Sequence, residues 1–147
     1  MNTRRLSRRD VLDDALRAGL SAALLSGLPS TAYAMLRERD PLEATVAAGS
    51  ILLPRERRRG RLLVAAIPVH LALSAVWTVA IAVVLPRRNP LAEGILAGLA
   101  IAALDLGVIG SRFPRIRALE TGPQIADHMA FGIIAAAGLA RNRKSLP

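Results

Sequence analysis

The chain has 147 residues, of which 52% are hydrophobic and only 3% aromatic, and it contains no cysteine. The lack of cysteine excludes disulfides and thiolate metal sites, and a core of Ala, Leu, Ile and Val suits helices packed closely in lipid. The net charge of +9 comes from 19 Arg and one Lys that mostly flank the apolar segments. Anionic lipid headgroups explain this charge better than nucleic acid does, because no nucleic-acid recognition motif is present.

The first predicted membrane span covers residues 15–36 and follows a basic N-terminal arm at residues 1–10. Small residues occupy one face of this helix and leucines the other, so we expect the face with Gly19 and Ala23 to pack against other helices. A second interpretation remains open. The run Ser7-Arg8-Arg9-Asp10-Val11-Leu12 resembles a twin-arginine export signal, and Ala32-Tyr33-Ala34 resembles its cleavage site.

A short apolar helix is predicted over residues 41–53. Asp40 suits its N-cap, Pro41 its first turn and Glu43 the positive end of its dipole. About 13 residues rise only about 20 Å, whereas the hydrocarbon core of a bilayer is about 30 Å thick. We therefore expect a half-length or interfacial helix. A thin fifth span is the alternative, and the orientation of the termini stays open because basic residues are nearly balanced between the two sides.

The second predicted span, residues 62–85, contains no Asp, Glu, Lys or Arg and is long enough to cross a bilayer. Further spans are predicted at residues 91–110 and 124–140, after short connections that make neighbouring helices antiparallel. Gly94 and Gly98 give the third span a close-packing face. The predicted fold is all-α, a single membrane domain over residues 1–147 with four transmembrane helices and one short helix.

Three ionisable residues lie inside the predicted spans, where such groups are costly and often functional. Counting from the connections places His70, Asp105 and His128 at about the same depth on three helices. Ser74 follows His70 at helical spacing, and Trp77 joins the same stripe. We expect His70, Ser74, Asp105 and His128 to form an intramembrane polar cluster. A structural hydrogen-bond network, a proton or cation pathway or small-ligand site, and catalysis remain open as its roles.

Sequence motifs for catalysis or metal binding do not accompany this cluster. The sequence lacks HExxH, Gly-rich phosphate loops, the Gly-x-Ser-x-Gly elbow and a Cys nucleophile. Two His and one Asp could in principle hold Zn²⁺ or Fe²⁺, but their spacing matches no ligand motif. We therefore predict a protein that is not an enzyme and has no catalytic, cofactor-binding or metal-binding residues.

Three short motifs resemble the YagU-like inner-membrane proteins over roughly residues 67–140. They are Pro68-Val69-His70 with Ser74 following, Gly94-Ile95-Leu96-Ala97-Gly98, and His128 opening the last span. Asp105 stands near where that family's pattern has a His. The resemblance implies a small, multi-pass protein of the bacterial inner membrane, and a bias to Arg over Lys and to Ala suggests a high-GC bacterium.

Two functional hypotheses follow from the sequence. The leading one is a non-enzymatic accessory or stress-related membrane component that associates with itself or with another membrane protein. The alternative is a minimal proton- or cation-handling protein, similar to a transporter or channel, that uses His70, Asp105 and His128.

Overall fold

A computed structural model describes residues 8–86 and 88–144, which fold entirely into helices and their connections. The elements are α1 (Arg8–Leu25), α2 (Leu28–Leu36), α3 (Glu43–Leu52), α4 (Arg59–Val84), α5 (Pro90–Ala102), the π-helix η1 (Ala103–Ile109), the 3-10 helix η2 (Gly110–Arg112), α6 (Pro114–Arg117) and α7 (Thr121–Lys144). The prediction of an all-α fold is confirmed. Residues 1–7 of the predicted basic arm lie outside the described residues.

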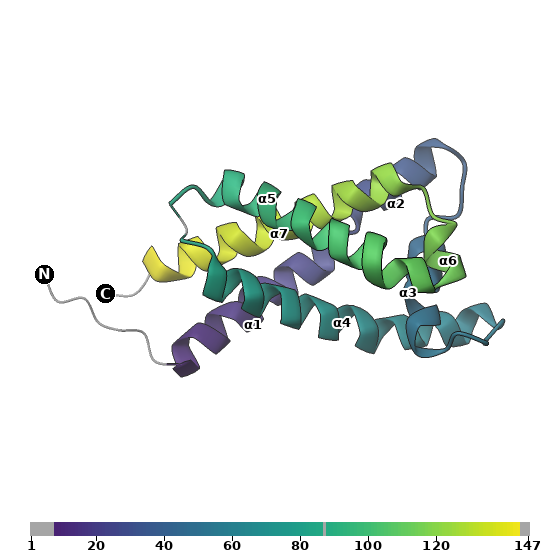
Figure 1. The fold of residues 1–147 in the computed structure, drawn as a ribbon, viewed down its shortest axis with the longest axis horizontal. Helices are drawn as coiled ribbons and strands as arrows, with labels where there is room; N and C mark the ends of the chain where they lie inside the picture. The colour runs from purple at the N-terminus through teal and green to yellow at the C-terminus, as the bar shows by residue number, and fades with distance from the viewer. Residues whose placement is uncertain (1–7, 87, 145–147) are drawn as a thin grey trace, which may run out of the picture.

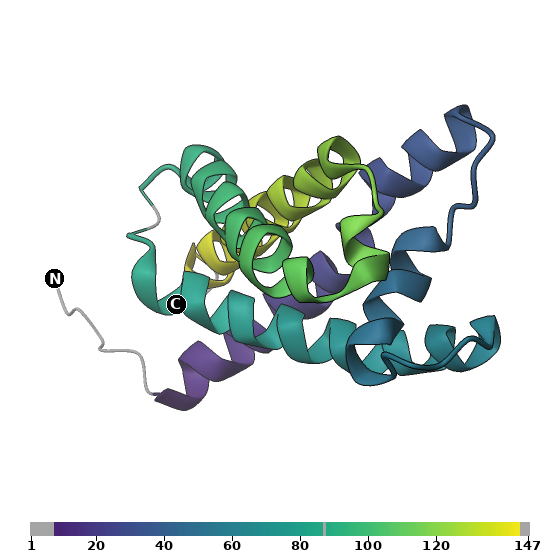
Figure 2. The same cartoon turned by 45° about the vertical axis from the view of Figure 1, so that its right-hand side comes forward.

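Four long helices, α1, α4, α5 and α7, run along the length of the molecule with alternating direction (Figure 1). The start of α1, the connection from α4 to α5 and the end of α7 gather at one end, while α2, α3 and α6 gather at the other (Figures 1 and 2). Helix α5 packs on α7, α3 packs on α4, and α1 packs on both α4 and α7. This up-and-down order follows from the short connections between neighbouring helices.

The first predicted span is not one helix, and the prediction of a continuous helix over residues 15–36 is wrong. The chain turns at Ser26 and Gly27, between α1 and α2. Pro29, near the start of α2, explains the break. Proline has no N–H to donate to the carbonyl four residues back, and its ring crowds that carbonyl.

The buried face of α1 consists of small residues. A Cβ added to Gly19 would lie 2.9 Å from Oγ1 of Thr78 on α4, and Ala23 is only 8% exposed. On the opposite face, Leu20 and Leu24 are 55% and 73% exposed. The helices of this bundle therefore meet through small side chains, and the leucines point outward. This is the arrangement expected where lipid replaces water around the helices.

Helices α5 and α7 touch backbone to backbone. A Cβ added to Gly94 would lie 2.7 Å from Cα of Ile133, and one added to Gly98 would lie 2.6 Å from Cα of Met129. Any larger side chain at either glycine would push the helices apart. Both glycines that the sequence singles out in the third span therefore lie in the α5–α7 contact.

The third predicted span changes helix type partway along. Helix α5 begins behind a side-chain cap, in which Oδ1 of Asn89 accepts the N–H of Ala92 at 3.2 Å. From Ala103 the chain widens into η1, in which the N–H of Gly110 bonds to the carbonyl of Asp105, five residues back. A π-helical turn of this kind is rare and often occurs at functional sites. The sequence predicts a span over residues 91–110, and the structure has one continuous helical run, Pro90–Arg112, in which the helix type changes at Ala103.

The short helix begins later than the sequence predicts. Oδ1 of Asp40 accepts the N–H of Leu42 at 3.0 Å, so Asp40 closes a turn, and α3 starts only at Glu43. Its ten residues rise about 15 Å. Helix α3 lies alongside the first half of α4, where a Cβ added to Gly49 would lie 2.7 Å from the carbonyl carbon of Leu62. The half-length helix thus packs against the bundle.

Two stretches of the described chain are long and apolar enough to cross a membrane, namely α4 and the continuous run Pro90–Arg112. The sequence predicts four such spans, but charged residues fill the first half of α1 and polar residues open and close α7. Only 22% of the most apolar 18-residue stretch of α4 is buried, and 28% of the corresponding stretch of Pro90–Arg112. Most of both apolar surfaces therefore faces outward, unlike the core helix of a soluble protein.

Candidate functional site

A cavity of about 550 Å³ lies between the α1–α2 break, α3, α4, η1 and α7. Its walls are mainly apolar, and its ionisable lining residues are His70, Asp105, Asp127 and His128. Lys and Arg are absent from its lining as far as the chain is described. A cavity of this size, mainly apolar with a few convergent polar groups, has the character of a ligand site.

Asp105 is the centre of the polar wall. Its Oδ2 accepts the indole N–H of Trp77 at 3.0 Å and lies 3.4 Å from Nε2 of His128. Its other oxygen, Oδ1, is buried and has no hydrogen-bond partner among the described residues. The side chains of Asp105 and His128 are only 14% and 19% exposed. This group joins α4, η1 and α7 around one carboxyl group.

A second contact of His128 shows which of its two ring nitrogens carries a hydrogen. Its Nδ1 lies 2.7 Å from the carbonyl oxygen of Gln124, which can only accept, so Nδ1 carries a hydrogen. In the neutral ring, Nε2 then has no hydrogen to offer Asp105. The contact with Asp105 is favourable only when the pair holds one further proton, either on the imidazole or on the carboxyl group. The geometry therefore places one shared proton between Asp105 and His128.

His70 lines the same cavity, but its hydrogen bond serves the broken helix. Its Nε2 lies 2.7 Å from the carbonyl oxygen of Ala23. Ala23 belongs to the last turn of α1, where carbonyls have lost their helical partners. His70 thus donates to the end of α1. Ser74, one turn further along α4, is buried, and its carbonyl accepts the hydroxyl of Thr78 at 2.7 Å.

Asp127 serves the other side of the helix break. Its Oδ1 accepts the N–H of Ser30 at 2.8 Å. Ser30 is the third residue of α2, so this N–H is one of the donors that a helix start leaves without a partner. A carboxylate there also meets the positive end of the helix dipole. The carbonyl at the end of α1 and the N–H at the start of α2 are therefore both satisfied by side chains from other helices.

The sequence predicts a cluster of His70, Ser74, Asp105 and His128. The structure places all four on the wall of one cavity and brings Asp105 and His128 into contact, whereas His70 bonds to α1. Asp127 is not part of the predicted cluster. Pro29 is the signal that could have found it, because a helix restarting there needs an acceptor for its first N–H groups.

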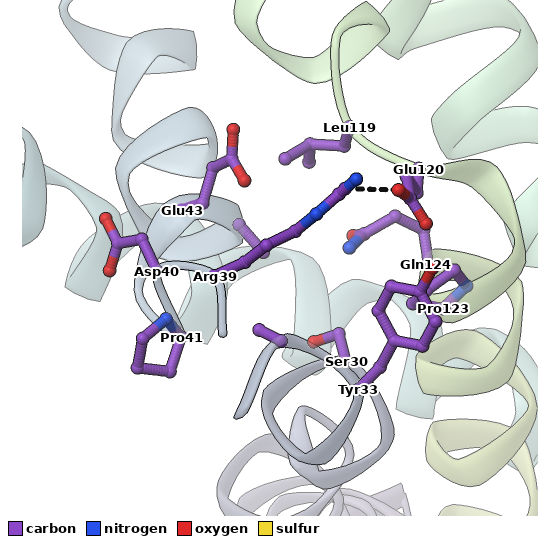
Figure 3. Close-up of a pocket in the computed structure, with 12 residues that line it drawn as sticks. Ser30, Tyr33, Arg39, Asp40, Pro41, Glu43, Leu119, Glu120, Pro123 and Gln124 are labelled. Atoms are coloured by element: carbon purple, nitrogen blue, oxygen red, sulfur yellow. Dashed lines mark hydrogen bonds and ion pairs between the residues drawn. The ribbon is translucent and has the colours of Figure 1, made fainter. Parts of the chain in front are cut away.

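A second, smaller cavity of about 40 Å³ lies where α2 approaches the start of α7 (Figure 3). Arg39 extends across it to form an ion pair with Glu120, and the guanidinium of Arg37 lies 5.6 Å from the centre of the Tyr33 ring. A hydrogen bond with Tyr33 and the nearby guanidinium groups of Arg39 and Arg37 lower the pKa of Glu120. This volume holds about one water. The group is a tether between α2 and α7.

Comparison of the chain with protein families, curated proteins and solved structures finds no match. Among the described residues, no group of three His, Cys, Asp or Glu side chains could hold a metal ion. The function is therefore argued from the geometry of the larger cavity.

Proposed function

We propose that the protein is a non-enzymatic, four-span membrane protein that takes up and releases a proton or another cation at Asp105 and His128. The four spans in this proposal are the bent pair α1–α2, α4, the run Pro90–Arg112, and α7. The proposal extends to a place in the bacterial inner membrane, which is what the resemblance to YagU-like proteins implies.

The outward apolar surface supports the membrane location. Val64, Val76 and Val83 along α4 are 67%, 61% and 73% exposed, and Leu96 on α5 is 67% exposed. A soluble protein rarely exposes apolar patches this extensive, whereas lipid chains cover them without cost. Arginines cluster in the connections, where anionic headgroups attract them.

The Asp105–His128 pair supports the handling of a proton, and it is the observation on which the proposal depends. The two groups together require one proton, and they line a cavity rather than a packed core. The other titratable groups facing this cavity are His70 on α4 and Asp127 on α7. Both bond to the backbone at the break between α1 and α2, so the proposal assigns proton exchange to Asp105 and His128, which contact each other.

The helix break itself supports a transport-like function. Irregular backbone at membrane depth is tolerated where it borders a cavity, and broken helices often form binding sites in transporters. Ser26 and Gly27, at the break, line the larger cavity.

Proteoliposomes test this function directly. The purified chain is reconstituted with an internal pH dye, and proton flux is followed after a pH step between about pH 5 and 8, where histidine titrates. We expect flux from the wild type and a loss of flux in Asp105→Asn and in His128→Gln. Asp13→Asn is the control, because Asp13 is exposed on α1, away from the cavity. A wild type without flux at any pH would refute the proposal.

A role as an accessory component is the second candidate, and the same exposed valines of α4 favour it. An apolar face that lipid can cover can also dock on a second copy or on another membrane protein. Cross-linking in native membranes tests this role, because a self-associating protein gives discrete dimers or larger species.

A further inference from the structure

We infer that the larger cavity binds a lipophilic amine in its protonated form, with the ammonium group on Asp105 and the apolar body between α3 and α4. This inference rests on the proposed function, because it names the class of cation that the site takes. Charge, hydrogen bonding and the shape of the apolar walls carry the argument.

The charge of the cavity is opposite to that of the chain. The whole chain carries a net charge of +9, yet the described lining of the cavity contains two carboxyl groups, Asp105 and Asp127, two imidazoles, His70 and His128, and no Lys or Arg. The break between α1 and α2 brings the negative end of one helix dipole and the positive end of the next to the cavity, so the two offset each other. With both imidazoles neutral this lining is negatively charged, so a cation can replace the proton that Asp105 and His128 share, whereas a neutral or anionic ligand cannot.

The carboxyl group of Asp105 can accept a further hydrogen bond. Oδ2 of Asp105 already faces Trp77 and His128, but Oδ1 is buried with no partner among the described residues. A buried acceptor without a donor is costly, and a charged donor makes the strongest bond to a carboxylate. An ammonium group combines such a donor with a positive charge, whereas an alcohol supplies a donor without charge and a quaternary ammonium supplies charge without a donor.

The walls of the larger cavity suit a ligand with an apolar body. Ala48 and Ile51 of α3 and Leu71 of α4 line the cavity, together with the rings of Trp77 and Phe131. Aromatic faces attract cations and pack against apolar groups. The volume of about 550 Å³ falls within the range of sites for small organic ligands.

The cavity also reaches the outer surface of the bundle. Leu24, Ile67 and Leu71 line it and are themselves 73%, 60% and 48% exposed. In a four-span arrangement this rim faces lipid. An amphipathic amine, which concentrates in a bilayer, then has a direct route from lipid to Asp105.

Trp77 provides the measurement, because it is the only tryptophan of the chain and bonds to Asp105. The full-length protein in detergent is titrated at neutral pH with 1-aminoadamantane, 1-adamantanol and adamantane-1-carboxylate, which share one apolar cage and differ in charge. Indole emission is followed in each titration. We expect the amine to bind at least about tenfold more tightly than the alcohol, and the carboxylate to bind least, since charge-assisted hydrogen bonds are the strong ones.

Variants locate the bound amine. Asp105→Asn keeps an acceptor for Trp77 and should weaken amine binding by at least about tenfold without changing alcohol binding. Asp13→Asn, outside the cavity, should change neither. Ala48→Phe fills the α3 wall and should block amine and alcohol alike, so it tests the cavity even if Asp105→Asn fails to fold.

The outcomes separate this inference from the proposed function. Equal binding of amine and alcohol by the wild type, or amine binding that survives Asp105→Asn or Ala48→Phe, overturns the amine site. Proton flux without amine binding also overturns it but leaves the proposed function standing. Selective amine binding without proton flux supports the site and removes the proton-handling function.

Discussion

Asp105 and His70 line one cavity but have different partners. Asp105 contacts Trp77 and His128, whereas His70 donates to the carbonyl of Ala23 at the end of α1. A change at His70 therefore affects the α1–α2 break, and a change at His128 affects the proton shared with Asp105. The two histidines should couple differently to Asp105.

A double-mutant cycle measures this difference. We expect Asp105→Leu combined with His128→Leu to cost less stability than the sum of the single changes, because the second change removes a group that the first left unpaired. Asp105→Leu combined with His70→Leu should be additive. Asp105→Asn should be tolerated better than Asp105→Leu, which leaves buried donors unpaired at about 1–3 kcal/mol. Thermal unfolding in detergent gives the change in stability for each variant. Additivity for Asp105→Leu with His128→Leu would show that the contact between these two residues contributes no interaction energy.

The sequence could predict that the polar residues lie at one level along the helices but not how they pair. Residue counts along the helices place His70, Asp105 and His128 on one level. Which histidine contacts Asp105 depends on the rotation of each helix about its own axis. His70 bonds to α1 instead, because the end of α1 has a carbonyl without a helical partner. That break comes from Pro29, a single residue inside an otherwise continuous apolar stretch.

Glu38 is the one non-glycine residue with positive φ in the described chain, at φ 53°. It ends α2 with two hydrogen bonds, from the Glu38 N–H to Met35 at 3.2 Å and from the Arg39 N–H to Ala34 at 2.8 Å. Glycine usually occupies this place in a helix end. We expect Glu38→Gly to raise the free energy of unfolding by about 1 kcal/mol, because the left-handed conformation strains a residue with a Cβ. Chemical denaturation tests this, with Glu43→Gly, at the first residue of α3, as the destabilising control.

Elements are joined by ion pairs at the end of the molecule that holds α3. Asp40, before α3, pairs with Arg59 at the start of α4, with Nη2 and Oδ1 2.8 Å apart. The hydrogen bonds from Arg59 and from the backbone of Leu42 lower the pKa of Asp40 to about 2. The pair ties the turn before α3 to the first turn of α4.

The lowered pKa of Asp40 predicts that the protein loses stability in acid. An unfolded Asp has a pKa of about 3.9, so the lowered folded value stabilises the fold above about pH 4, and that contribution disappears as the pH falls towards 2. We expect the wild type to lose more stability than Asp40→Asn between about pH 5 and 2, and the difference to shrink at high salt. Identical acid profiles for the two proteins would contradict the role of the ion pair.

The contact between α5 and α7 depends on Gly98. A Cβ at this position meets the backbone of α7, 2.6 Å from Cα of Met129, whereas a Cβ at Gly107 in η1 meets nothing within 4 Å. We expect Gly98→Ala to destabilise the protein by about 1–3 kcal/mol through overpacking. Gly107→Ala should leave stability unchanged or raise it. Thermal unfolding of the two variants, which add the same methyl group, gives the comparison.

Helix boundaries show which elements a sequence predicts well. The apolar run at residues 62–85 becomes α4, Arg59–Val84, and the run at residues 124–140 lies within α7, Thr121–Lys144. Hydrophobic length and flanking charges suffice for such helices. The change to a π-helix at Ala103 has no comparable signal, because it depends on which backbone carbonyl each N–H reaches in the packed chain.

At the scale of the whole molecule, the length of α3 determines how many spans the proposed membrane arrangement has. It is ten residues long, packs on the first half of α4, and has its two connections at the same end of the molecule (Figure 2). Three ion pairs lie at this end of the molecule: Arg39 with Glu120, Arg59 with Asp40, and Arg61 with Glu56. A helix rising about 15 Å covers half of the hydrocarbon thickness.

Both connections of α3 should therefore lie on one side of the membrane. The chain has no cysteine, so single cysteines at Glu38, Arg55 and Arg88, all exposed, are unambiguous probes. In sealed vesicles, a membrane-impermeant maleimide should label Glu38→Cys and Arg55→Cys from the same side and Arg88→Cys from the other, because the proposed arrangement has α4 crossing between Arg55 and Arg88. Labelling of Glu38→Cys and Arg55→Cys from opposite sides would mean that α3 crosses and would replace four spans with five. Labelling of all three from one side would mean that α4 does not cross, and the membrane-spanning arrangement would be abandoned.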